Sequence, residues 1–305
     1  MHNMPDYEAI LRPIAGDHLR LMEPLSRYTL AQLGGPADAL VLADSVNLLE
    51  QTVRVAWENE LTVRVIGGGA NILIGDGGFR GLVVVNRARG MAFGLNGTVE
   101  VESGVIIPTL ARECMVRGLG GFEWAVGVPG TIGGAVVNNA GAHGSDMAAC
   151  VEWVEVAEAN LPKQKWSRDR LEYQYRESAL KRRKQPYAVL RAGLRFTPNC
   201  DPAVLAAQAE TFHTNRRRTQ PPGASLGSMF KNPTGDYAGR LIEAAGLKGV
   251  QHGRVMISPI HANFFVNMGG GTAADYLSLI RLAQTEVLAR FNVALELEIE
   301  LVGEM

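Results

Sequence analysis

The sequence predicts an α+β protein with more than one domain, and three observations lead to that class. A chain of 305 residues is longer than a single domain usually is. Hydrophobic residues make up 47% and charged residues 20% of it, which is the composition of an ordinary globular protein and excludes disordered and fibrous classes. Segments with helical spacing of apolar residues alternate with segments that have the two-residue alternation of strands.

The first two thirds of the chain contain a clear series of elements. Leu48, Leu49 and Val53 recur at helical intervals, and β-branched residues gather where strands are expected. Pro108 suits the first turn of a helix that Gly118 ends. The elements expected here are, in order, a helix over 45–60, strands over 61–66, 81–85 and 98–102, a helix over 108–118, and strands over 151–156 and 187–196.

The remaining third begins with a helix at Asp201 and Pro202, because aspartate caps free backbone amides and proline fits the first helical position. A domain boundary is therefore placed at 198–201. Thr272 and Asp275 have the spacing of a capping box, which predicts the start of a long helix. The elements expected here are helices over 201–218 and 237–245, a strand over 262–267, the long helix from 272, and a final strand in which Glu296, Glu298 and Glu300 alternate with apolar residues.

Charge and cysteine content exclude several functions. The 30 basic and 31 acidic residues give a net charge of -1, which provides no general field for nucleic acid or an anionic membrane. No apolar stretch approaches the length of a membrane span, and acidic Asp6 and Glu8 disfavour a secretory signal, so we expect a cytoplasmic protein. The three cysteines (Cys114, Cys150, Cys200) lack metal-ligand spacing, and we expect no metal and reduced thiols, with a catalytic cysteine as the alternative.

Glycine is the one residue in excess, with 35 in the chain, and it concentrates in two segments. The first, 65–74, places Gly67, Gly68, Gly69, Ala70 and Asn71 directly after a strand pattern. Backbone amides in such a loop can form a nest for an anion, and the missing side chains allow a phosphate to approach closely. The alternative is an ordinary tight turn. The segment fits neither the dinucleotide fingerprint nor the P-loop pattern.

The second glycine segment, 127–144, contains six glycines interleaved with β-branched residues, which is more than one turn explains. Two such cradles suit a ligand with two phosphates held by main-chain donors. Such binding is compatible with the near-neutral net charge.

Several motifs together give the chain a family resemblance. They are Gly34-Gly-Pro-Ala37, Gly67-Gly-Gly-Ala-Asn71, Gly127-Val-Pro-Gly-Thr-Ile-Gly-Gly134 with Asn139-Ala-Gly141, Tyr175-Arg-Glu-Ser178, Gly227-Ser-Met-Phe-Lys-Asn-Pro233 and His261-Ala-Asn-Phe264. In this order they resemble the UDP-N-acetylenolpyruvoylglucosamine reductases, and the shorter, type II form of that family. The chain departs from the family pattern at His143 and Ala179, where aromatic residues are expected.

The resemblance implies a fold of the vanillyl-alcohol-oxidase type. Two FAD-binding subdomains, 20–85 and 86–199, would be followed by an α+β substrate-binding domain, 200–305. It also implies FAD as cofactor, NADPH as hydride donor, a UDP-sugar as substrate and a monomer as the active form. Whether His143 is covalently attached to the flavin stays open.

The resemblance further assigns roles to individual residues. It implies Ser228 as proton donor, with Arg176 and Glu298 completing the catalytic set, and Tyr175, Lys231 and Asn232 as substrate-binding residues. From the sequence alone, Ser228 is equally a turn residue, Arg176 a member of a surface ion pair, and Glu298 part of a solvated strand face. The cofactor-binding residues implied are Gly67, Gly68, Gly69, Ala70, Asn71, Gly127, Pro129, Gly130, Thr131, Gly133, Gly134, Asn139 and Gly141.

Two other functions remain as alternatives. One is an oxidase of the same fold that passes electrons to oxygen, against which Ser228, Arg176 and Glu298 argue together. The other is a nucleotide-sugar binding module without chemistry, for which Ala179 is the only indication.

Overall fold

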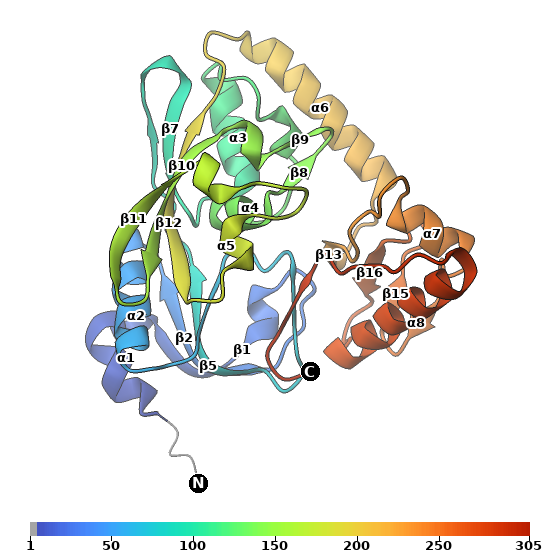
Figure 1. Ribbon diagram of the computed structural model, residues 1–305, viewed down its shortest axis with the longest axis horizontal. Coiled ribbons are helices and arrows are strands. Elements are labelled where there is room, and N and C mark those ends of the chain that lie inside the picture. Colours follow the sequence, from blue (N-terminus) through green and yellow to red (C-terminus); the bar gives the residue numbers. More distant parts are fainter. Residues whose placement is uncertain (1–4) are drawn as a thin grey trace. The chain divides into compact units, whose positions relative to one another are not determined.

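The computed structural model describes residues 5–305, and its contacts divide the chain into two units (Figure 1). The first unit comprises the chain up to Met22 together with Asp38–Gly68 and Gly81–Thr214; the second comprises Glu23–Ala37, Gly69–Arg80 and Asn215–Met305. Residues 1–4, which precede the Asp6 and Glu8 that disfavour a secretory signal, lie outside the described residues. The three-part division at 20–85, 86–199 and 200–305 stays a prediction.

The first unit is built on two sheets. Four strands in the order β1-β2-β5-β3 form one, and the last residues of β1 and the first of β2 and β5 belong to the second unit. The other contains five antiparallel strands in the order β11-β10-β12-β7-β6. The strands are β1 (Leu19–Pro24), β2 (Pro36–Ala43), β3 (Val63–Ile66), β5 (Phe79–Asn86), β6 (Met91–Phe93), β7 (Thr98–Glu102), β10 (Val151–Glu158), β11 (Leu161–Ser167) and β12 (Tyr187–Arg195), with a small hairpin of β8 (Gly141–Ala142) and β9 (Ser145–Asp146).

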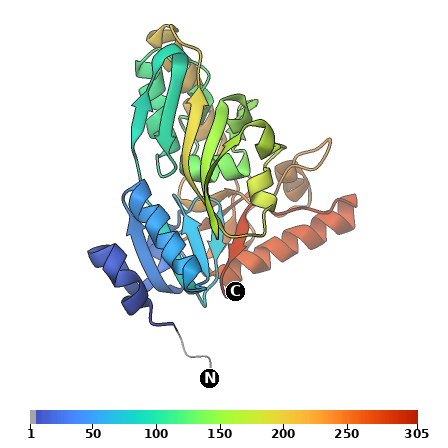
Figure 2. The same cartoon turned by 60° about the vertical axis from the view of Figure 1, so that its left-hand side comes forward.

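Helices cover these sheets. Figure 2 shows α1 and α2 side by side in blue, and α2 also contacts β12. Ser45 caps α2, since its side chain accepts a hydrogen bond from the Leu48 amide at 3.3 Å. The helices of this unit are α1 (Tyr7–Ala15), α2 (Val46–Glu58), α3 (Ile107–Val116), α4 (Ile132–Asn138) and α5 (Ala179–Arg182), and α6 (Pro202–Thr219) begins here and ends in the second unit.

Strand β12 supplies side chains to two cores of the first unit. The alternation of apolar residues predicts one face, and all its members are buried: Ala188, Leu190, Ala192, Leu194 and Phe196. Val189 on the other face is buried as well. Ala188 and Leu190 pack with residues of α1, α2, β2 and β5, whereas Val189 and Leu194 pack with residues of α3, α4 and β10. Alternation therefore identified the strand without showing that both of its faces are covered.

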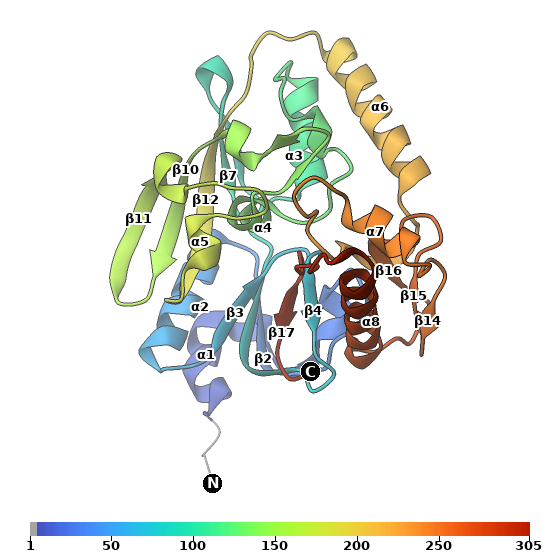
Figure 3. The same ribbon diagram turned by 45° about the vertical axis from the view of Figure 1, so that its right-hand side comes forward.

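The second unit is an antiparallel sheet with two helices. The strands β13 (Ala224–Ser228), β16 (Phe264–Asn267), β15 (Val255–Ile257) and β14 (Gln251–His252) are joined in that order. Helix α8 (Ala273–Phe291) contacts β14, β15 and α7 (Ala238–Ala244), as Figure 3 shows. Its capping box of Thr272 and Asp275 is confirmed. A separate parallel pair joins β4 (Ile72–Ile74) to β17 (Glu300–Val302).

Three parts of the sequence-based element assignment were incomplete or wrong. The residues before 45, for which no element was predicted, form α1, β1 and β2; β2 is buried on both faces and so shows no alternation. The second glycine segment contains α4, where a loop was expected. The final strand is shorter than predicted, because residues 298 and 299 form a bend and β17 starts at Glu300.

Two further observations concern the cysteines and membranes. Within residues 5–305, no helix is long and apolar enough to cross a bilayer. Cys114, Cys150 and Cys200 are free thiols, as predicted. Burial raises the pKa of Cys114 to about 12 and raises the pKa of Cys150 further, so both stay protonated and unreactive at neutral pH.

Candidate active site

The two glycine segments meet inside the first unit. A Cβ atom built on Gly68 would lie 3.0 Å from the Cα of Gly130, and one on Gly67 would lie 2.1 Å from the Thr131 hydroxyl. The two segments therefore approach each other so closely that packing alone requires glycine at positions 67 and 68. The sequence predicted two glycine cradles, and the structure brings their backbones together.

Helix α4 follows directly and uses its glycines in two different ways. Gly133 lies against another segment: its amide donates to the Ser103 carbonyl at 2.8 Å, and a Cβ there would lie 3.0 Å from Ser103 Cβ. Gly134 is exposed, and a Cβ there would meet only the Thr131 hydroxyl, at 4.0 Å. Packing thus explains Gly133 but leaves open space at Gly134. This space fits a ligand that approaches the backbone, as FAD would.

Asn139 joins the end of α4 to the segments that follow. Its side-chain nitrogen donates to Asp146 Oδ2 at 3.1 Å and to the Gln174 carbonyl at 3.0 Å, and its oxygen accepts from the Ala148 amide at 3.0 Å. Both amide hydrogens are therefore used within the protein. The side chain of this predicted cofactor-binding residue fixes the loop.

Arg176 is held by the same loop. Its guanidinium donates to the Gly141 carbonyl at 2.6 Å and to the Asn139 carbonyl at 3.5 Å, and its own carbonyl accepts from Lys181 Nζ at 3.1 Å. The backbone of Arg176 has a positive φ of 57°, an uncommon conformation for a residue other than glycine. The Tyr175 ring, 52% exposed, lies 5.2 Å from the guanidinium carbon. Arg176 is thus fixed beside two predicted cofactor-binding residues, Asn139 and Gly141.

Ser228 and Glu298 both belong to the second unit. A backbone hydrogen bond links Glu298 to Met229, the residue after Ser228. The Met229 carbonyl accepts this bond from the Glu298 amide at 2.9 Å. The Lys231 amide donates to the Glu296 carbonyl at 2.9 Å, and Phe230 and Leu297 form an antiparallel bridge. Both Ser228 and Glu298 are half-buried. The solvated strand face considered as an alternative for Glu298 is wrong, because the residue lies in a bend packed against the segment of Ser228.

The other predicted residues of this unit lie around the same segment. Lys231 Nζ lies 3.5 Å from Glu296 Oε2, and Asn232 accepts a hydrogen bond of 3.1 Å from the amide of Ala238, the first residue of α7. Asn71 donates from its side chain to the Glu298 carbonyl at 3.1 Å. Gly69 has a φ of 60°, and a Cβ there would lie 2.0 Å from the Tyr28 carbonyl oxygen.

One residue of this site, Asn263, was missed by the sequence analysis. It is 2% exposed, and its side chain binds both polar groups of Phe230: the oxygen accepts from the Phe230 amide at 3.0 Å and the nitrogen donates to the Phe230 carbonyl at 2.8 Å. The backbone carbonyl of Asn263 also accepts from the Met229 amide at 2.8 Å. The available signal was its place in the motif 261–264, to which no role was assigned.

His261 of the same motif supports Asn263. Burial lowers the pKa of His261 below its ordinary value of 6.5, and its Nδ1 accepts a hydrogen bond of 3.2 Å from the Asn263 amide. A ring nitrogen accepts only when it is unprotonated. The neutral form is therefore the one that fits this structure.

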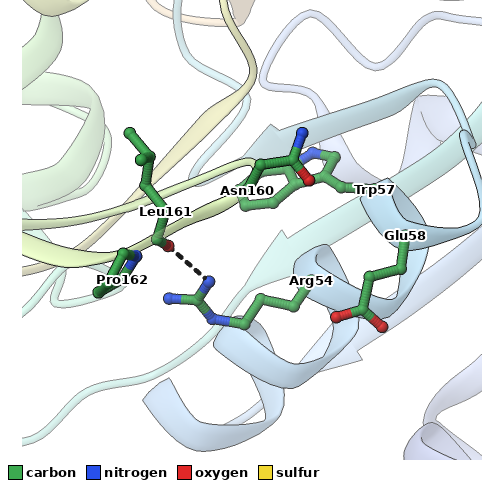
Figure 4. A pocket seen from close by; sticks show the side chains of 6 residues that line it. All are labelled: Arg54, Trp57, Glu58, Asn160, Leu161 and Pro162. Atoms are coloured by element: carbon green, nitrogen blue, oxygen red, sulfur yellow. Dashed lines mark hydrogen bonds between the residues drawn. The ribbon is translucent and has the colours of Figure 1, made fainter.

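Two other features involve residues outside the predicted catalytic, substrate-binding and cofactor-binding sets. His143 stacks on Phe212 with ring centroids 4.4 Å apart. A cavity of about 290 Å³ in the first unit is lined by Arg54, Trp57, Glu58, Asn160, Leu161 and Pro162, as Figure 4 shows, and includes none of the predicted site residues.

Comparison with known proteins decides the family. Residues 219–302 match the C-terminal domain of UDP-N-acetylenolpyruvoylglucosamine reductase, and residues 37–160 match an FAD binding domain. The chain is 44% identical to the UDP-N-acetylenolpyruvoylglucosamine reductase of Rubrobacter xylanophilus, with 92% of this chain and 94% of the relative covered. It is 43% identical to that of Chloroflexus aggregans, with 93% and 97% covered.

The chain belongs to the UDP-N-acetylenolpyruvoylglucosamine reductase family. A solved structure agrees: the crystal structure of the enzyme from Thermus caldophilus covers 93% of this chain and 98% of its own, with 33% identity and a TM-score of 0.78. The resemblance stated from the motifs is confirmed, as are the α+β fold class and an FAD-binding domain. As a member of this reductase family with an FAD-binding domain, the chain is an FAD-dependent oxidoreductase. The roles of individual residues remain predictions.

Proposed function

We propose that this enzyme reduces the enolpyruvyl ether of a UDP-N-acetylglucosamine derivative to the lactyl ether of UDP-N-acetylmuramate, with NADPH as reductant and FAD as cofactor. The reaction belongs to peptidoglycan precursor synthesis. The observation that carries the proposal is the hydrogen bond between Glu298 and Met229, which brings a carboxylate residue and Ser228 to the same segment in a chain of this family.

FAD is assigned to the glycine segments. When bound, it supplies hydride transfer, from NADPH to the terminal carbon of the enolpyruvyl double bond. The open space at Gly134 and the fixed loop of Asn139 and Gly141 support this assignment. The residues proposed to hold FAD are Gly67, Gly68, Gly69, Ala70, Asn71, Gly127, Pro129, Gly130, Thr131, Gly133, Gly134, Asn139 and Gly141.

The chain's own residues complete the reaction. Addition of hydride leaves negative charge on the neighbouring carbon and its carboxylate, and the Ser228 hydroxyl delivers the proton to that carbon. Arg176 stabilises the growing charge, since a guanidinium forms strong, charge-assisted hydrogen bonds with a carboxylate. Glu298 orients the substrate or relays the proton. Fixed donors of this kind are the usual source of stabilisation for a developing enolate.

Substrate binding is assigned to three further residues. Tyr175 is exposed. Lys231 and Asn232 follow Ser228 by three and four residues. A lysine ammonium and an asparagine amide are suited to the phosphate oxygens of a UDP-sugar. We propose that the enzyme works in the cytoplasm as a monomer, without nucleic acid or membrane as partner, and that 20–85, 86–199 and 200–305 are its functional domains.

Anaerobic rapid mixing tests the function. The purified yellow protein is mixed with NADPH, and loss of the flavin absorbance is followed; the enolpyruvyl UDP-sugar is then added. We expect NADPH to bleach the flavin and the UDP-sugar to restore its colour. If oxygen restores the flavin colour and the UDP-sugar does not, the oxidase is favoured. If NADPH does not bleach the flavin, a binding module is favoured.

A further inference from the structure

The segment that carries Ser228 is fixed by hydrogen bonds on both sides. On one side, Met229 and Lys231 bond to Glu298 and Glu296. On the other, Met229 and Phe230 bond to Asn263 alone, through its carbonyl and both ends of its side-chain amide. A single buried side chain therefore replaces the neighbouring strand at Phe230.

The strand pairing of β13 with β16 is too irregular to fix Ser228 by itself. Ala224 pairs with Asn267 and Ser225 with Val266, but a bulge intervenes before Ser228, which pairs with Phe264. Gly227 lies within this bulge with a φ of 77°. Bulges redirect the side chain that follows and loosen the local ladder. The hydrogen bonds of Asn263 begin one residue after this irregularity.

From this arrangement we infer that Asn263 is a positioning residue for Ser228. It holds the Met229 and Phe230 peptides so that the serine hydroxyl keeps a constant place relative to Glu298, without itself touching substrate or cofactor. The inference rests on the proposed function, because it assigns Asn263 to the proton-delivery step and to no other.

Strand β16, which begins directly after Asn263, offers a matched control. Asn267 is also buried, at 7% exposed, and its side chain donates to the Ala31 carbonyl at 2.8 Å and accepts from the Gly269 and Gly271 amides at 2.9 Å each. Neither Gly269 nor Gly271 belongs to the segment of Ser228. Asn263→Asp and Asn267→Asp each keep the size of the side chain. The first removes the donor to the buried Phe230 carbonyl, and the second removes the donor to the buried Ala31 carbonyl.

The test measures both half-reactions, substrate affinity and thermal stability of the two variants and the wild type. We expect similar decreases in Tm for both. Only Asn263→Asp is expected to slow flavin reoxidation at saturating UDP-sugar, by about 100-fold, the effect of a displacement of roughly 1 Å at a reacting group. Flavin content, reduction by NADPH and the Kd of the UDP-sugar, measured by spectral titration of the oxidised protein, should remain within about twofold, a change of no more than roughly 0.4 kcal/mol.

Several results would overturn the inference. These are normal reoxidation in Asn263→Asp, equal slowing in Asn267→Asp, or an equal loss of both half-reactions. If Asn263→Asp does not fold, Asn263→Ser, which introduces no buried charge, takes its place; failure of both to fold would make the residue structural. A wild type that the UDP-sugar does not reoxidise would instead refute the proposed function.

Discussion

The side-chain amide of Asn71 donates a hydrogen bond of 3.1 Å to the backbone carbonyl of Glu298. The Glu300 amide in turn donates to the Asn71 carbonyl at 3.0 Å. Hydrogen bonds thus join the end of the first glycine segment to the backbone around Glu298, the predicted catalytic glutamate. Glu298 is held by Asn71 through its carbonyl and by Met229 through its amide.

This relationship predicts that the Asn71 side chain serves Glu298 and that Asn71 contributes to FAD binding only through its backbone, so Asn71→Asp affects Glu298 more than the flavin. The carboxylate would face the Glu298 carbonyl in a part-buried site, where an acceptor left without its donor costs at most about 1–3 kcal/mol. We expect a lower free energy of unfolding in urea, slower reoxidation by the UDP-sugar, and one flavin per chain. Loss of flavin at unchanged stability would show that the side chain serves the cofactor instead.

The glycines separate into two groups that alanine substitution distinguishes. In Gly68→Ala the added Cβ would press on the Gly130 backbone at 3.0 Å, and overpacking of this kind costs about 1–3 kcal/mol. In Gly134→Ala the Cβ has only Thr131 nearby, at 4.0 Å, and alanine favours the helix by up to about 1 kcal/mol. We expect Gly134→Ala to be as stable as the wild type without ligand yet to bind FAD more weakly.

Apoprotein stability and FAD titration measure the two effects separately. Full FAD affinity in Gly134→Ala would remove that glycine from the proposed cofactor site.

Ser228→Ala separates the half-reactions. The hydroxyl is needed only after hydride has been delivered, so bleaching by NADPH should stay near the wild-type rate. Reoxidation by the UDP-sugar should slow by about 10²- to 10⁴-fold, the usual loss on removing a positioned acid. Ser225→Ala, on the same strand before the bulge, is the control and should leave both rates unchanged. Equal slowing of both steps would make Ser228 a structural or flavin-binding residue.

Stability should depend on His261 at mildly acidic pH. Burial lowers the pKa of this imidazole in the folded state, so the unfolded chain takes up the proton more readily. The contribution of His261 is therefore complete above its ordinary pKa of 6.5 and is lost as the pH falls below it. We expect Tm to decrease between pH 7 and pH 5, roughly the range in which an ordinary histidine titrates.

The variant His261→Gln keeps an acceptor for the Asn263 amide but does not titrate. Its Tm should change less over the same pH range. An equally steep decrease in the variant would assign the pH dependence to other groups.

The sequence predicted elements well where a local signal exists. Asp201 and the pair of Thr272 and Asp275 marked helix starts, and each makes the expected capping bond. It failed where burial is two-sided, as in β2, because alternation then disappears. It also failed at α4, because Gly133 and Gly134 disfavour a helix on propensity alone. Close approach to Ser103 accounts for the glycine at 133 only.

The site was predicted as a set of residues more readily than as a geometry. The motif 227–233 singled out Ser228 and the family resemblance singled out Glu298. Only the structure shows that the Glu298 amide bonds to the carbonyl of Met229, the residue after Ser228. Asn263 was not predicted, because an asparagine side chain that bonds to the backbone of a distant residue produces no periodic pattern in the sequence. Its function depends on Phe230, which is distant in the chain and unremarkable in type.

The parallel pairing of β4 with β17 also affects the order of folding during synthesis. Residues 72–74 leave the ribosome long before their partners at 300–302, and the hydrogen bond between Asn71 and Glu298 spans 227 positions. While most of the first unit is being made, β4 has an unsatisfied edge, and such edges favour incorrect pairing between chains. The second unit, which contains both strands, should therefore complete its folding only after residues 300–302 have been translated.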